Sequence, residues 1–183
     1  LTITWKLEAS TLTVSYQVDN PGTCTMYFGI GGHPGFHIPL NPQLTFEDYR
    51  LDFGGQAAPR QILLSEDGFI LEKDVPLLLT DGRYLPLSHE LFANDAIVMK
   101  DMPGQITIES LKDSRKIRAD FPDMNHLGIW NCSHAPFVCI EPWSSLPSRK
   151  NVVEDLETQP GLVSLEAGGT YLNTWSISII TGD

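Results

Sequence analysis

The fold of this chain is decided by the alternation of apolar and polar residues across positions 1–18, LTITWKLEASTLTVSYQV. A strand with one buried face places an apolar residue at every second position, because successive side chains point to opposite faces. The alternate apolar positions are Ile3, Trp5 and Leu7 before the turn at Ala9-Ser10, and Leu12, Val14, Tyr16 and Val18 after it. The pattern predicts a β-hairpin whose apolar residues face a core.

The same period of two recurs along the rest of the chain, whereas helical periodicity is scarce. After a turn at Asn20-Pro21-Gly22, the alternation resumes at Met26 and Phe28. Further predicted strands span residues 43–53, 96–100, 105–111, 115–121, 127–131, 137–141 and 170–180. Many short strands separated by turn residues predict an all-β fold, an antiparallel β-sandwich or barrel, in a single domain over residues 1–183.

Composition narrows the class of ligand. The chain has 23 acidic and 12 basic residues, which gives a formal net charge of −11. Nucleic acids and anionic membranes attract clustered Lys and Arg, so we expect neither as a partner. No apolar run approaches the ~20 residues of a membrane helix. The acidic balance favours a neutral ligand, and the sequence contains no phosphate loop and no dinucleotide fingerprint.

Cys24, Cys132 and Cys139 are the three cysteines of the chain. They fit neither a metal pattern nor a disulfide framework, which needs an even number. Each lies beside apolar strand residues, which predicts buried, reduced thiols. Reduced thiols favour a cytoplasmic location.

The first motif that suits chemistry is Gly31-Gly32-His33-Pro34-Gly35-Phe36, at the end of a predicted strand. Glycines let backbone or ligand approach closely, and Pro34 biases His33 toward an extended conformation. A histidine held this rigidly suits a general acid or base. The alternative is a structural histidine that bonds a turn carbonyl.

The second motif is Phe137-Val138-Cys139-Ile140-Glu141-Pro142-Trp143, in which an apolar strand ends in a carboxylate. Desolvation at such a position raises a carboxyl pKa toward the range of a useful base. Trp143 beside it offers a flat apolar face on which a sugar can stack. The alternative is an exposed glutamate next to a core tryptophan.

The third motif is Leu91-Phe92-Ala93-Asn94-Asp95-Ala96, before another apolar strand. Asp95 is a candidate for ligand binding, although aspartate is also common in turns for purely structural reasons. His89, His126 and His134 show no spacing typical of metal ligands, so no metal site is expected.

Taken in this order, the motifs resemble the aldose 1-epimerase (galactose mutarotase-like) superfamily, and most of all its bacterial lactose-operon branch. Leu127-Gly128-Ile129-Trp130 and Ala135-Pro136 also match, and the resemblance runs from about Tyr16 to the C-terminus. It implies an antiparallel β-supersandwich that interconverts the α and β anomers of a hexose such as galactose or glucose, without cofactor. This chain then corresponds to the C-terminal portion, without the family's N-terminal strands.

The resemblance also implies a role for each motif. His33 matches the general acid toward the ring oxygen, and Glu141 matches the base that takes the proton of the C1 hydroxyl. Asp95 matches a residue that hydrogen-bonds sugar hydroxyls, and Trp143 or Phe36 is expected to line the sugar site.

Two alternatives to a mutarotase stay open. The first is a sugar-binding sandwich that has lost efficient turnover, which the missing N-terminal contacts favour. The second is a hexose-6-phosphate 1-epimerase, for which only Arg83, Arg149 and Lys150 could form a phosphate clamp and which the net charge of −11 opposes.

Overall fold

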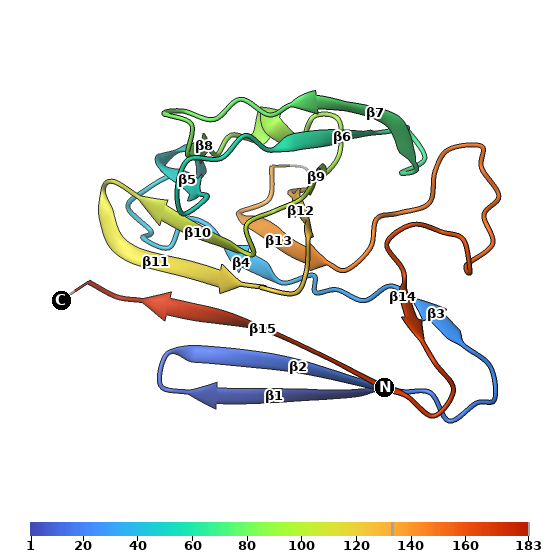
Figure 1. Cartoon of the computed structure of the whole chain (residues 1–183). Coiled ribbons are helices and arrows are strands. Elements are labelled where there is room, and N and C mark those ends of the chain that lie inside the picture. The colour runs from blue at the N-terminus through green and yellow to red at the C-terminus, as the bar shows by residue number, and fades with distance from the viewer. Residues whose placement is uncertain (133, 183) are drawn as a thin grey trace.

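Two antiparallel sheets form the body of the protein in the computed structural model, which describes residues 1–132 and 134–182 (Figure 1). The seven-stranded sheet has the order β1 (Thr2–Glu8), β2 (Thr11–Asp19), β15 (Thr170–Ile180), β11 (Asp113–Asp120), β10 (Gln105–Ser110), β5 (Tyr49–Asp52), β8 (Tyr84–Pro86). The six-stranded sheet has the order β4 (Gly35–His37), β13 (Phe137–Trp143), β12 (His126–Trp130), β9 (Ile97–Lys100), β6 (Arg60–Leu64), β7 (Ile70–Pro76). A small third sheet pairs β14 (Val163–Leu165) with β3 (Met26–Phe28).

The hydrophobic core lies between the two large sheets. It takes Val14, Tyr16, Ile106, Ile108 and Trp175 from the seven-stranded sheet, and Ile97, Met99, Leu127, Ile129, Val138 and Ile140 from the six-stranded sheet. Two sheets that share one core through alternate residues form a sandwich, so the predicted all-β antiparallel sandwich is confirmed. The described helices are two short 3₁₀ turns, Phe46–Asp48 and His89–Phe92, and no described helix could cross a membrane.

The N-terminal hairpin forms as predicted, but its first strand does not face a core. In β2, Val14 and Tyr16 are buried. In β1, which pairs with β2 at the sheet edge, Ile3, Trp5 and Leu7 are exposed. The alternation therefore predicted the strand correctly and its burial wrongly, because no described part of the second sheet packs against β1.

Two other predictions are corrected by the structure. Residues 43–53 are not one strand: Phe46–Asp48 form a 3₁₀ turn before β5, and the backbone N–H of Thr45 donates to Asp48 Oδ2 at 2.9 Å. Of the three thiols, Cys139 is buried as expected, whereas Cys24 and Cys132 are exposed because both lie in connections outside the strands.

Strands β6, β7 and β8 lie in residues 60–86, where no strand was predicted. Strand β7 is an edge strand with mostly half-exposed residues, and the register between β6 and β7 shifts at Ile62 and Leu64. A shifted, half-exposed edge pair loses the strict period of two on which the prediction depends.

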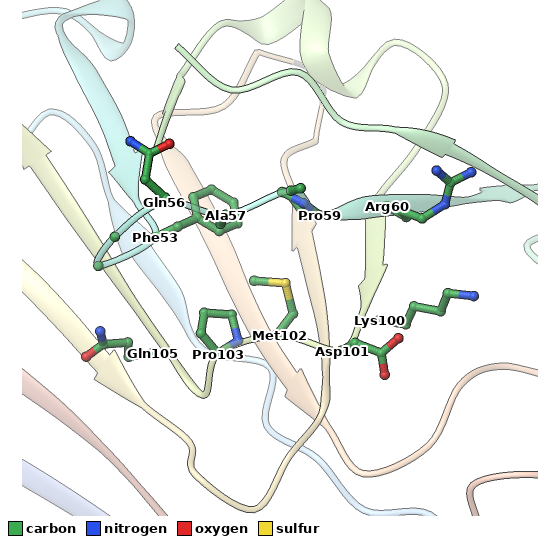
Figure 2. A pocket seen from close by; sticks show the side chains of 13 residues that line it. Phe53, Gln56, Ala57, Pro59, Arg60, Lys100, Asp101, Met102, Pro103 and Gln105 are labelled. Atoms are coloured by element: carbon green, nitrogen blue, oxygen red, sulfur yellow. The ribbon is translucent and has the colours of Figure 1, made fainter. Parts of the chain in front are cut away.

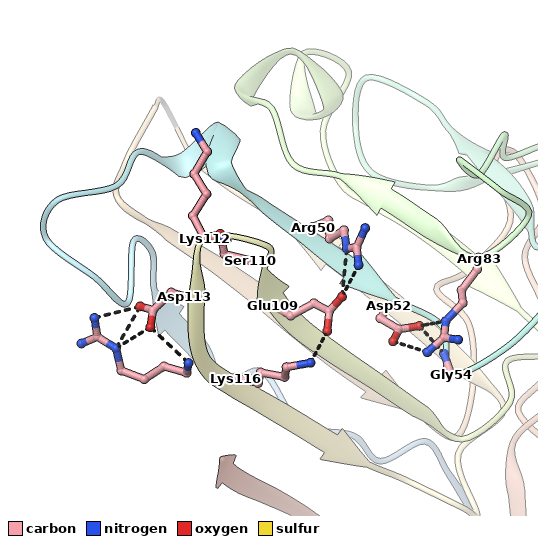
Figure 3. A network of polar contacts seen from close by, with 10 residues as sticks. Arg50, Asp52, Gly54, Arg83, Glu109, Ser110, Lys112, Asp113 and Lys116 are labelled. Carbon is pink, nitrogen blue, oxygen red and sulfur yellow. Dashed lines mark hydrogen bonds and ion pairs between the residues drawn. The ribbon is translucent and has the colours of Figure 1, made fainter. Parts of the chain in front are cut away.

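The outer face of the seven-stranded sheet carries ion pairs (Figure 3). Glu109 accepts hydrogen bonds from Arg50 Nη2 at 2.6 Å and from Lys116 Nζ at 2.7 Å. Asp52 accepts from Arg83 Nε at 2.6 Å, and this hydrogen bond lowers the pKa of Asp52 despite its partial burial. These cations are thus committed to carboxylates on the face away from the core.

Trp5 and Trp175 provide a matched test of this architecture, because they flank Val14 in one cross-strand row. Trp175 is 3% exposed and Trp5 is 64% exposed. We expect Trp175→Ala to lower the free energy of unfolding by about 3–5 kcal/mol, as for a buried tryptophan. We expect Trp5→Ala to change it by only about 0.5 kcal/mol. Urea unfolding of both variants checks the difference, and equal losses would show that the β1 face is covered.

Candidate active site

The segment that carries His33 is hydrogen-bonded along strand β13 like an additional strand. Ser144 N–H donates to Ile30 O at 2.9 Å, Gly32 N–H to Pro142 O at 2.9 Å, and Ile140 N–H to Pro34 O at 3.1 Å. This register places the residue between Gly32 and Pro34 beside the residue between Ile140 and Pro142. His33 and Glu141 therefore meet.

The same segment is fixed from the other sheet by two aromatic residues. Trp175 Nε1–H donates to the Tyr16 hydroxyl at 3.0 Å, and that hydroxyl donates to Gly31 O at 3.1 Å. A Cβ atom at Gly32 would lie only 2.6 Å from the Trp175 ring. Glycine is thus required at 32 for the segment to lie against the indole.

His33 and Glu141 form the central pair of the site. His33 Nε2 lies 3.3 Å from Glu141 Oε1. The His33 side chain is 63% exposed, whereas that of Glu141 is only 6% exposed. One partner is thus accessible from solvent and the other is recessed below it, with Trp130 edge-on to the His33 ring at 6.1 Å between centroids.

Burial makes Glu141 a stronger base than an ordinary glutamate. Desolvation raises its pKa, the nearby His33 opposes that rise, and the negative charge of Asp95 adds to it. Glu141 Oε1 is buried and accepts no hydrogen bond from any described residue, although His33 Nε2 lies 3.3 Å from it. A recessed carboxylate with a raised pKa suits the removal of a proton from a ligand hydroxyl.

Trp143 lies beside this carboxylate and is held between two glycines. A Cβ at Gly128 would lie 2.7 Å from the Trp143 ring and 3.3 Å from Glu141 Oε2. A Cβ at Gly31 would lie 2.7 Å from the same indole. The ring therefore crosses strand β12 at Gly128. This position lies next to Glu141, where the sequence predicts an aromatic face.

Asp95 precedes strand β9 in a left-handed backbone conformation, with φ of 75°. Its Oδ1 accepts a hydrogen bond from Ala96 N–H at 2.8 Å, which is the turn role that its sequence context also predicted. Its negative charge adds to the rise in the pKa of Glu141 that desolvation causes.

Phe36 does not line this site, contrary to the prediction. It pairs with Val138 across β4 and β13, and both side chains belong to the core between the sheets. Directly opposite residues of an antiparallel pair share a face. Because Glu141 alternates with the core residues Val138 and Ile140, its side chain lies on the other face of the sheet.

Two residues of the site were missed by the sequence reasoning. Trp130 and Cys139 are directly paired across β12 and β13, two residues along each strand from the Gly128–Glu141 pair and therefore on the same face. The imidazole of His33, the thiol of Cys139 and the carboxylate of Glu141 lie within 4.8 Å of one another. The sequence did contain a signal for Cys139, because it lies two residues before Glu141 and alternate residues of a strand share a face. The apolar sequence around it instead predicts a buried thiol in the core.

The larger cavity in Figure 2 lies elsewhere. It has a volume of about 460 Å³ and is lined by residues of the connections 53–60 and 100–105, with Met102 and Phe53 in its wall. Neither His33 nor Glu141 contributes to it. His33 and Glu141 lie instead on the face of the six-stranded sheet that points away from the core.

Comparison with known proteins agrees with these observations. No protein-family model matches the chain. Protein LacX, chromosomal, of Lactococcus lactis subsp. lactis is 30% identical over an alignment of 186 positions, gaps included, which covers 98% of this chain and 62% of LacX. The chain thus spans less than two thirds of the length of the curated relatives that it matches.

Solved structures show the same architecture. A galactose mutarotase related enzyme from Lactobacillus acidophilus superposes with a TM-score of 0.89 at 24% identity, over 99% of this chain and 62% of that one. A galactose mutarotase-like protein from Lactobacillus casei gives 0.87 at 25% identity, over 97% and 62%. With its sandwich and its similarity to LacX, this chain has the fold of the galactose mutarotase-like proteins and resembles that superfamily.

Proposed function

We propose that the chain carries the acid–base site of an aldose 1-epimerase, which interconverts the α and β anomers of a free aldose. The observation that carries this proposal is the 3.3 Å contact between His33 Nε2 and Glu141 Oε1. The anomeric hydroxyl and the ring oxygen of an aldose are bonded to the same carbon, C1. The acid and the base that serve them must therefore lie next to each other.

The reaction follows from the two protonation states. Glu141 as carboxylate removes the proton of the C1 hydroxyl, while His33 as imidazolium donates a proton to the ring oxygen. The bond between C1 and the ring oxygen breaks and leaves the open-chain aldehyde. Rotation about C1–C2 presents the other face of the carbonyl, and ring closure with reversed proton transfers restores both residues.

The surrounding residues suit a sugar. Trp143 beside Glu141 and Trp130 beside His33 supply apolar faces, against which the C–H groups of a hexose can pack. Asp95 supplies a carboxylate oxygen for sugar hydroxyls. A hexose such as galactose or glucose is the proposed substrate, and a cytoplasmic location stays a prediction.

The extent of the functional unit is also a proposal. We assign residues 1–183 to one domain that corresponds to the C-terminal portion of the full sandwich. The chain's 62% coverage of its relatives and the uncovered apolar residues of β1 support this assignment.

The binding-module alternative differs from the enzyme in turnover alone, so it predicts sugar binding without mutarotation. The hexose-6-phosphate 1-epimerase alternative needs cations that can bind a phosphate, and its three candidates are already in ion pairs. Arg83 is paired with Asp52, Arg149 with Glu154 and Lys150 with Asp67. Each of the three cations has a carboxylate partner of its own, and Arg83 lies on the outer face of the other sheet (Figure 3).

Removing the base is the first test. We expect Glu141→Gln to slow mutarotation about 10²–10⁴-fold, because the amide keeps the shape but cannot accept the proton. His33→Asn should slow it on the same scale. Polarimetry follows the reaction of fresh α-glucose or α-galactose, and calorimetry shows whether sugar still binds. Glu8→Gln, on exposed β1, is the control and should retain the wild-type rate. A normal rate for Glu141→Gln would refute the assignment.

Asp95→Asn separates binding from chemistry. Asparagine tolerates the left-handed conformation at this position and can still accept the hydrogen bond from Ala96 N–H. A hydroxyl contact made equally in ground and transition states affects KM. We therefore expect KM to rise with little change in kcat, measured from initial polarimetric rates over a range of sugar concentrations. A loss confined to kcat would move Asp95 into the catalytic step.

The pH profile tests the environment of Glu141. Its raised pKa means that the base is protonated, and lost, at a higher pH than for an ordinary glutamate. The rate should fall as pH decreases, with a midpoint above the usual ~4.3. In Asp95→Asn the midpoint should move down, because one negative charge that raises the pKa is gone. An acidic midpoint at or below ~4.3 in the parent protein would contradict the burial argument.

A further inference from the structure

The geometry points to a transition-metal site made of His33, Cys139 and Glu141, which takes Zn²⁺ and competes with the sugar for the acid–base pair. The three side chains each offer one ligand atom, and these atoms lie within 4.8 Å of one another. Among the described residues, this is the one group of at least three such side chains that meets this spacing.

Two of the ligands are fixed by the sheet and one can move. Cys139 and Glu141 are alternate residues of strand β13, so their side chains share one face. Both are buried, at 4% exposure each. His33 is exposed enough for its ring to rotate toward them. Zinc bonds of about 2.0–2.3 Å need ligand atoms closer together than 4.8 Å, so the three ligand atoms must draw together around the ion.

A glycine neighbours the fixed sulfur ligand. Gly35 pairs with Cys139, and a Cβ added there would be 3.6 Å from the sulfur, at ordinary contact distance. Gly128 pairs with Glu141 on the other side, where the Trp143 ring lies. The buried Glu141 Oε1 accepts no hydrogen bond from a described residue, and His33 Nε2 lies 3.3 Å from it.

The donor set selects the kind of metal. One sulfur, one imidazole nitrogen and one carboxylate oxygen suit Zn²⁺ and similar ions, whereas Mg²⁺ and Ca²⁺ prefer oxygen ligands alone. Three protein ligands leave a fourth position for water. Binding displaces the thiol proton of Cys139 to solvent and leaves thiolate on the metal. A bound ion occupies both His33 Nε2 and the Glu141 carboxylate, so neither can exchange protons with a sugar.

Calorimetry with Zn²⁺ on the reduced protein tests the site directly. We expect one ion per chain, no binding of Mg²⁺, and an affinity that falls by at least about tenfold in Cys139→Ser. Cys24→Ser, which changes an exposed thiol outside the site, is the matched control and should bind as the parent does. Co²⁺ is a second probe, because a sulfur ligand adds a charge-transfer absorption band that Cys139→Ser should remove.

Inhibition is measured as the ratio of mutarotation rates with and without Zn²⁺ and should be much weaker in Cys139→Ser. The inhibition rests on the proposed function, whereas the binding does not. If the chain binds Zn²⁺ through Cys139 but shows no mutarotation, the proposed epimerase function is wrong and the proposed metal site stands. Zinc affinity unchanged in Cys139→Ser, affinity lost in Cys24→Ser, or no zinc binding would each overturn the site.

Discussion

The backbone pairing of residues 30–34 with strand β13 is the constraint on which the site depends. Three backbone hydrogen bonds set the register, and that register places His33 beside Glu141. The pairing holds because the segment is also fixed from behind, where Tyr16 binds Gly31 O and Gly32 lies against Trp175. The seven-stranded sheet thus positions His33, while the six-stranded sheet carries Glu141.

The burial of Glu141 in this arrangement lowers the stability of the fold. A buried polar atom without a hydrogen bond destabilises a protein by about 1–3 kcal/mol. Glu141 Oε1 accepts no hydrogen bond from a described residue, and its contact with His33 Nε2 at 3.3 Å offsets part of this cost. Burial also raises the pKa of the same carboxyl. Instability at one carboxylate and reactivity toward a ligand hydroxyl have the same origin.

Strict alternation predicted most strands of the sandwich well, but it did not predict what packs against each strand. Strands β2, β10 and β15 appear where the period of two is strongest. The exposure of Trp5 could not be foreseen, because alternation shows that a face is apolar and not what covers it. The half-exposed edge strand β7 carries too little pattern to be recognised.

The site followed the same division. His33 and Glu141 were identified from their motifs, and the structure brings them together. Phe36 was wrongly assigned to the site because a sequence motif does not show which face of the sheet a side chain occupies. Its pairing with the core residue Val138 places it on the core face. Trp130 and Cys139 were missed because their role depends on cross-strand register, which a single sequence does not specify.

The central claim is that the His33–Glu141 pair exchanges protons with a sugar hydroxyl and ring oxygen. Exchange spectroscopy by NMR on glucose or galactose labelled at C1, at anomeric equilibrium, measures this most directly. The account predicts that adding the protein increases the exchange rate between the α and β signals in proportion to protein concentration. Signals that shift or broaden through binding, with an unchanged rate of anomer exchange, would contradict it.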